Sequence, residues 1–173
     1  MNTATTAPTL ARVWEALDAL TDPEIPVVTL REMGILRDVR HAADGHTVLV
    51  VITPTYNGCP AMAQIEDDVH ASVMALGIPA RVITQLAPAW TTDWMSDVAR
   101  QKLHDYGIAP PAACGNTPQV IQFASHKGAP DVVPCPRCGS QDTTETSHFG
   151  STACKALYKC LRCMEPFDYF KPY

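Results

Sequence analysis

The chain has 173 residues and a formal net charge of −5 at pH 7, and 46% of its residues are hydrophobic. These values fit one ordinary domain plus a small one and exclude a disordered or collagen-like chain. The acidic charge argues against a broad nucleic-acid-binding surface. The first residues lack the pattern of a secretory signal, and no apolar run approaches the ~20 residues that span a bilayer. We therefore expect a cytoplasmic protein that binds neither membranes nor nucleic acid.

The first part of the chain predicts a small α/β domain. Apolar residues recur at helical spacing from Leu10 to Leu20, and Asp22-Pro23 would end that helix. Further apolar runs and turn residues predict strands over 35–42, 47–53 and 80–86 and a helix over 60–76. The last two strands and the helix between them form a βαβ unit, so these two strands should be parallel. The first two strands form a hairpin, and the sheet should therefore be mixed.

The segment Asp22-Pro23-Glu24-Ile25-Pro26 is a first candidate site. It places two carboxylates in a turn stiffened by prolines, where Asp22 and Glu24 could point at a metal or at a cysteine. The alternative is that the segment only ends the helix and that its charges are solvated.

Cys59 is a second candidate. Pro60 suits the first position of a helix, so Cys59 is expected at the N-cap. A helix N-terminus favours a thiolate, because its free N–H groups and its dipole both stabilise negative charge. The alternative is a small buried apolar side chain at the start of the helix.

The second part of the chain predicts a helix, a linker and a small β module. Ser96-Asp97 begin the helix, Gly107 ends it, and a proline-rich linker follows. Strands are expected near 119–125, 143–149, 155–160 and 167–171. We therefore predict a domain over 1–109, a linker and connecting segment over 110–130, and a module over 131–173.

Two CxxC pairs lie in this module, Cys135/Cys138 and Cys160/Cys163, with 21 residues between them. Two such pairs supply the four thiolates of a tetrahedral zinc-ribbon site. An iron–sulfur cluster also takes four cysteines, and the softness of the ligands does not separate the two. Disulfides are the further alternative, and the lack of an export signal argues against them.

Cys154 is a fifth cysteine, six residues before Cys160. It would be either an extra or exchanging ligand of the same metal site or a packed thiol on a strand.

Several motifs resemble those of known families. The Asp22–Pro26 turn together with Gly58-Cys59-Pro60 resembles the SufT-like family of iron–sulfur assembly domains, over roughly residues 8–88. This resemblance implies a role in the maturation of metalloproteins. It also implies that Cys59 is the reactive or cluster-handling residue. Asp22 and Glu24 would orient the transferred species.

A second resemblance covers nearly the whole chain. The segments 88–94, 106–111, 135–140, 149–158 and 165–170 are similar to those of the PaaD family, also called PaaJ, of bacterial phenylacetyl-CoA epoxidase systems. This implies an accessory protein of aerobic phenylacetate degradation, acting beside a di-iron oxygenase and a reductase that carries flavin and an iron–sulfur cluster.

We therefore expect a non-catalytic maturation factor that assembles or repairs the iron or iron–sulfur centres of the epoxidase. Its partners would be the oxygenase and reductase subunits, and formation of a homodimer is left open. None of the predicted helices carries Glu-x-x-His, and the chain has no Gly-rich dinucleotide fingerprint. A structural subunit of the oxygenase complex is the main alternative. A thiol enzyme is less favoured, because no pairing of His with Cys is evident from the sequence.

Overall fold

The computed structural model describes residues 6–111 and 132–173, and the side chains from residue 10 onward. The predicted strand near 119–125 and most of the expected linker lie outside these residues. The chain divides into two compact units between Ala99 and Arg100. Each unit is described by itself below.

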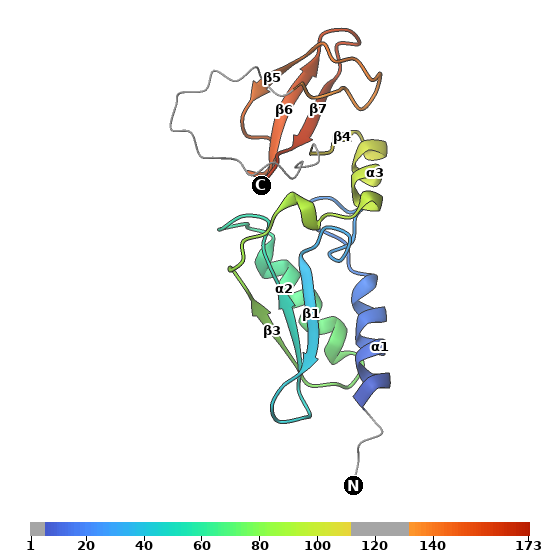
Figure 1. Cartoon of the computed structure of the whole chain (residues 1–173), viewed down its shortest axis with the longest axis vertical. Coiled ribbons are helices and arrows are strands. Elements are labelled where there is room, and N and C mark those ends of the chain that lie inside the picture. Colours follow the sequence, from blue (N-terminus) through green and yellow to red (C-terminus); the bar gives the residue numbers. More distant parts are fainter. Residues whose placement is uncertain (1–5, 112–131) are drawn as a thin grey trace. The chain divides into compact units, whose positions relative to one another are not determined.

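The N-terminal unit is a three-stranded sheet with two helices. The helices are α1 (Thr6–Asp18) and α2 (Met62–Met74), and the strands are β1 (Leu36–His41), β2 (Val48–Ile52) and β3 (Ala80–Thr84). In the order β1-β2-β3 (Figure 1), β1 is antiparallel to β2 and β2 is parallel to β3. The predicted hairpin and βαβ unit are therefore both present.

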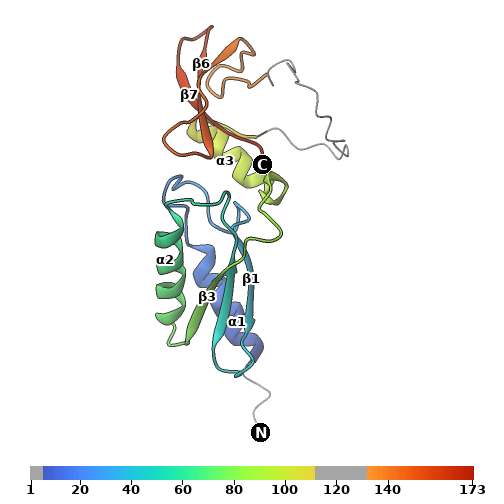
Figure 2. The ribbon, with the colours of Figure 1, turned by 90° about the vertical axis from the view of Figure 1, so that its left-hand side faces the viewer.

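Apolar spacing explains how these elements pack. In β2, Val48, Val50 and Ile52 alternate along the strand and are fully buried. Helix α2 buries Ile65 and Val69, four residues apart, with Val73 completing the same stripe. Helix α2 lies to one side of the strands (Figure 2), and α1 packs against both α2 and β1. Both helices therefore cover the same face of the sheet.

The loop after β3 is hydrogen-bonded to, and packs against, the segment around the start of β1. The indole N–H of the buried Trp90 donates to the carbonyl oxygen of Met33 at 2.9 Å. The short 3-10 helix η1 (Thr92–Trp94) follows, and the guanidinium of Arg37 lies 3.5 Å from the centre of the Trp94 ring. Gly34 has a φ of +73° and packs directly against the backbone of Trp94.

The C-terminal unit is a four-stranded sheet. Its strands are β4 (Ile108–Ala109), β5 (Thr143–Ser147), β6 (Lys155–Cys160) and β7 (Pro166–Phe170), in the order β4-β7-β6-β5. Strand β4 is parallel to β7, and the other pairs are antiparallel. Helix α3 (Asp97–Tyr106) precedes β4 and has the division between the units in its first turn.

The division between the units falls earlier than the expected domain boundary after residue 109. Ile108 and Ala109 pair with Asp168 and Tyr169, so the segment after α3 belongs to the second sheet. Ala109 also lies in the core cluster of this unit, with Val133, Cys135, Ala156, Tyr158, Cys160, Phe167 and Tyr169. The domain boundaries themselves stay a prediction.

The fold class is as predicted: a small mixed sheet with helices, followed by a β module. None of the helices in residues 6–111 and 132–173 has the length and hydropathy of a membrane span.

Candidate metal centre

Four cysteine side chains meet at one end of the second sheet. The Sγ atoms of Cys135, Cys138, Cys160 and Cys163 all lie within 4.8 Å of one another. The sulfurs of Cys135 and Cys163 are 3.8 Å apart, and those of Cys138 and Cys160 are 3.6 Å apart. Four sulfurs bound at about 2.3 Å around one ion form a tetrahedron with edges of about 3.8 Å. The spacing therefore fits a metal site, whereas a disulfide needs about 2.05 Å.

Each cysteine pair lies on a tight turn. In the first turn, the N–H of Gly139 donates to the carbonyl oxygen of Cys135 at 2.9 Å. In the second, the N–H of Cys163 donates to the Sγ of Cys160 at 3.4 Å. The residue after each pair has a left-handed backbone, with φ of +69° at Gly139 and +66° at Met164. The two turns are therefore similar knuckles, although only the first has glycine at the left-handed position.

The backbone also sets the proton affinity of the second pair. The N–H of Cys163, aided by that of Arg162, lowers the pKa of the Cys160 thiol to about 6. The N–H of Glu165 acts to lower the pKa of Cys163, but partial desolvation of the sulfur and the three neighbouring sulfurs together raise it to about 12. One thiolate therefore forms readily, while four clustered thiolates require a bound cation to offset their charge.

The site joins the core of the second unit to its surface. Cys135 and Cys160 are buried, and both belong to the core cluster. Cys138 and Cys163 are exposed. A metal held by all four would thus fix the two exposed knuckle ends onto the core.

Arg137, inside the first knuckle, was not singled out from the sequence. Its guanidinium lies against Gly107, the residue after α3, where an added Cβ would be 2.6 Å from Nη2. Gly107 has a φ of +98°. A glycine after a helix signals the end of the helix, but nothing in the pattern indicated which side chain would use the space beside it.

Cys154 lies apart from the four-cysteine group. It precedes β6, whereas Cys160 ends β6, so the extended strand separates them by roughly 20 Å. Cys154 is buried, and its Sγ is 3.0 Å from the hydroxyl oxygen of Thr152. In this arrangement it is a packed thiol and does not reach the same ion as the other four.

Asp22 holds the turn that follows α1. Its Oδ1 accepts the backbone N–H groups of Glu24 at 2.8 Å and Ile25 at 3.0 Å, and the residue is buried. The N–H of Asp22 donates to the carbonyl oxygen of Val28 at 3.0 Å, which closes the loop. Glu24 is exposed. The carboxylate of Asp22 therefore serves as a hydrogen-bond acceptor for the backbone of its own turn.

Cys59 is not the N-cap of α2, and that prediction is wrong. The helix begins at Met62 with Ala61 as its N-cap. Pro60 lies in a preceding turn, which is closed by the N–H of Met62 donating to the carbonyl oxygen of Cys59 at 3.2 Å. The half-buried thiol of Cys59 therefore lies on the loop between β2 and α2, after Gly58 with a φ of +86°.

The structure does not gather Cys59, Asp22 and Glu24 into a metal-holding group. Within the described ranges, the four-cysteine cluster is the group of three or more His, Cys, Asp or Glu side chains with that geometry.

Two family models match different parts of the chain. The model of a family described as iron–sulfur cluster assembly protein matches residues 10–82. A second model, described as the PaaD zinc beta ribbon domain, matches residues 121–171 and so includes all four clustered cysteines.

Two solved structures are similar to the N-terminal part. A crystal structure of a domain of unknown function, DUF59, from Bacillus anthracis has 25% identity and a TM-score of 0.52, covering 59% of this chain and 97% of that one. A conserved hypothetical protein from Thermotoga maritima has 25% identity and a TM-score of 0.47, covering 60% and 98%. The first of these supports the fold of the N-terminal unit.

A curated relative covers both parts of the chain. It is named as a subunit of a "putative 1,2-phenylacetyl-CoA epoxidase" from Escherichia coli (strain K12), and it is 45% identical over 165 residues. The alignment spans 95% of this chain and 93% of the relative. At this identity and coverage, the chain belongs to the PaaD family.

Proposed function

We propose that this chain is an accessory factor that assembles or repairs the iron or iron–sulfur centres of a phenylacetyl-CoA epoxidase complex in aerobic phenylacetate degradation. The observation that carries the proposal is the 45% identity, over 95% of the chain, to a relative named as part of that epoxidase. Because the sequence similarity to this relative covers both units, the complete two-unit architecture supports a role shared with that relative.

The N-terminal unit supports the handling of metal centres. It matches the iron–sulfur assembly family over residues 10–82. In our proposal, the half-buried thiol of Cys59 holds the iron or cluster during transfer. Asp22 fixes the turn after α1 by accepting two backbone N–H groups, and the exposed Glu24 orients the cargo or its carrier.

The four-cysteine site supports a structural zinc ion in the C-terminal unit. Its sulfur–sulfur distances of 3.6 and 3.8 Å match a tetrahedral ZnS₄ site, and four protein ligands leave no open coordination position. Such an ion would stabilise a small β module rather than supply chemistry. An iron–sulfur cluster on the same four cysteines is the alternative occupant.

The proposed partners are the oxygenase and reductase subunits of the epoxidase. In this role the chain is not itself an enzyme, it works in the cytoplasm, and it binds no nucleic acid. The ribbon would recognise the client protein. Whether two copies associate is left to measurement.

The test is to co-express the oxygenase and reductase subunits with the wild-type chain, with Cys59→Ser or with no accessory chain. We expect Cys59→Ser to lower the iron content and epoxidase activity to the level found without the chain. Cys154→Ser is the matched control, because it also removes one sulfur but from a buried packing position. Full metal loading and activity with Cys59→Ser would refute a transfer role for Cys59.

A structural subunit of the oxygenase complex is the second candidate, favoured because the curated relative is named as a subunit of the epoxidase. It predicts stable, stoichiometric co-purification with the active complex and no effect of Cys59→Ser. An accessory factor should instead be separable from a fully loaded, active complex.

A further inference from the structure

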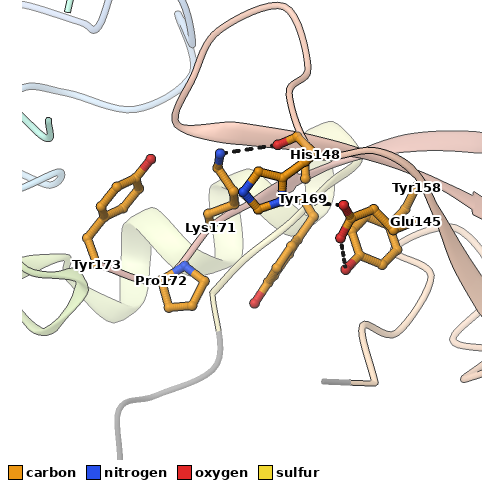
Figure 3. A pocket seen from close by; sticks show the side chains of 8 residues that line it. Glu145, His148, Tyr158, Tyr169, Lys171, Pro172 and Tyr173 are labelled. Carbon is orange, nitrogen blue, oxygen red and sulfur yellow. Dashed lines mark hydrogen bonds and ion pairs between the residues drawn. The ribbon is translucent and has the colours of Figure 1, made fainter. Parts of the chain in front are cut away.

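The C-terminal unit contains a pocket that the proposed function does not use. It is lined by Tyr158, Tyr169, Tyr173, Glu145, His148 and Lys171, and we call it the tyrosine pocket (Figure 3). Its volume is about 530 Å³. Pockets of roughly 300–1,000 Å³ lined by aromatic groups with a few polar ones are typical of small-ligand sites.

Aromatic and apolar side chains form one part of the wall of the tyrosine pocket, and polar side chains form the rest. The rings of Tyr158 and Tyr169 stand edge to face, with centroids 5.5 Å apart and an interplanar angle of 77°. Ala156 is paired with Tyr169 across β6 and β7, and its small side chain leaves room beside the ring. Pro172 lines another wall. Such surfaces favour a planar ring, which can stack on one tyrosine and meet the edge of another.

One wall is held in place by the backbone before β6. The hydroxyl of Tyr173 donates to the carbonyl oxygen of Ala153 at 3.1 Å. The N–H of Lys171 donates to the carbonyl oxygen of Cys154 at 2.9 Å. A ligand would therefore meet a preformed wall, which lowers the entropy cost of binding.

The polar groups that line the pocket differ in how many hydrogen-bonding partners they already have. Both oxygens of Glu145 have polar neighbours: the Tyr158 hydroxyl donates to Oε2 at 3.2 Å, and the His148 Nδ1 lies 3.3 Å from Oε1. The Lys171 ammonium has three N–H donors. Its contacts in the described ranges are one oxygen acceptor, the carbonyl of His148 at 3.2 Å, and the ring of Phe149 at 4.5 Å.

This difference places the unused hydrogen-bonding capacity at the Lys171 end of the pocket. His148 lies between the Lys171 ammonium and the Glu145 carboxylate (Figure 3). Because each Glu145 oxygen already has a polar neighbour, the remaining hydrogen-bonding capacity is at Lys171, whose positive charge calls for an anionic acceptor. A charge-assisted bond to a carboxylate is stronger than one to a neutral group.

We propose that the tyrosine pocket binds a small aryl carboxylate, with its ring among the tyrosines and its carboxylate on the Lys171 ammonium. This inference does not rest on the proposed metal-transfer role, because it uses neither Cys59 nor the four-cysteine site.

The test is isothermal titration and amide NMR of the full chain, as purified, with phenylacetate, a small probe with one ring and one carboxylate. We expect saturable binding with a Kd of about 1 mM or tighter, and amide shifts centred on β6, β7 and residues 171–173. Benzylamine keeps the ring but reverses the charge, and cyclohexylacetate keeps the charge but loses the planar ring. Both should bind about tenfold more weakly or not at all.

A matched pair of variants tests the assignment of Lys171. Lys171→Met keeps an apolar stem but removes the charge, and it should weaken phenylacetate binding about tenfold. Lys159→Met makes the same change on β6 outside the pocket and should leave binding unchanged. The proposal is overturned by equal binding of benzylamine, by equal binding to the Lys171→Met chain, or by no saturable binding to the wild-type chain. The comparison of the two probes needs only the wild type, so it still decides the question if a variant does not fold.

Discussion

Gly34 shows how strongly one residue can constrain the N-terminal unit. An added Cβ there would lie 2.6 Å from the carbonyl oxygen of Trp94 and 2.7 Å from its Cβ, and the φ of +73° already disfavours any other residue. Since a backbone atom cannot move aside cheaply, we expect Gly34→Ala to lower the free energy of unfolding by about 3 kcal/mol or more. Chemical denaturation measures this.

Gly45→Ala is the matched control for Gly34→Ala. Gly45 lies in the same unit with a φ of +68°, and nothing lies within 4 Å of its added Cβ. Backbone strain is then the one cost of Gly45→Ala, so we expect its free energy of unfolding to fall by about 1 kcal/mol. Equal losses for the two variants would show that the close packing of Gly34 on Trp94 contributes nothing.

Asp22 and Glu24 are predicted to differ although they belong to one motif. Asp22→Ala removes an acceptor of two backbone N–H groups at a buried position, so we expect a loss of about 1–2 kcal/mol in stability. Glu24→Ala changes an exposed side chain, and its effect should stay within about 0.5 kcal/mol. Thermal unfolding of the two variants tests this, and a stable Asp22→Ala chain would argue against the turn-holding role.

At the scale of elements, the β1–β2 hairpin depends on a charged turn residue. The Oδ1 of Asp44 accepts the N–H groups of Thr47 and His46, both at 2.8 Å, and its Oδ2 accepts the Thr47 hydroxyl at 2.7 Å. These bonds, led by the N–H of Thr47, lower the pKa of Asp44 from 3.8 to about 2. The charged carboxylate therefore stabilises the folded state above the ordinary pKa and loses that effect as the pH falls through the lowered value.

The prediction for this hairpin concerns Asp44→Asn. The variant should melt at a lower temperature than the wild type near neutral pH, and the gap should close as the pH falls from about 4 to about 2. Melting curves of both proteins over this range give the answer. A gap that stays constant with pH would show that the charge of Asp44 is not what stabilises the turn.

The second sheet is predicted to depend on its metal. Four thiols must lose protons to bind zinc, so protons compete with the ion increasingly as the pH falls toward and below the Cys160 pKa of about 6. We expect zinc release and loss of amide dispersion from β5–β7 to occur together on acidification or chelation. Amides of β1–β3 should stay dispersed under chelation at neutral pH, and a β5–β7 sheet that survives metal removal would contradict this dependence.

At the scale of the whole molecule, local patterns predicted most of the architecture. The apolar run of β2, the i, i+4 stripe of α2 and the spacing of the CxxC pairs each depend on neighbouring residues, so they were readable from the sequence. The pairing of Ile108-Ala109 with β7 was not, because a two-residue strand has no period and its partner lies far along the chain.

The candidate sites also differ in whether a local sequence pattern predicts them. The four-cysteine cluster was predicted because ligand spacing within each knuckle is local. The start of α2 was misplaced because Pro60 fits a tight turn as well as a first helical turn, so Cys59 is not an N-cap. The tyrosine pocket combines three strand or loop segments and the residues after β7, and no single motif marks it.

For the molecule as a whole, our proposal is that the four-cysteine site holds zinc and that Cys59 carries out the transfer. The most direct measurement is the content of zinc, iron and acid-labile sulfide in the full chain purified without oxygen, with a visible spectrum. We predict about one zinc per chain and no visible colour, unchanged in Cys59→Ser and lost in Cys160→Ser. Iron with sulfide and a broad visible band that disappears in Cys160→Ser would contradict the zinc assignment and make the ribbon a cluster carrier.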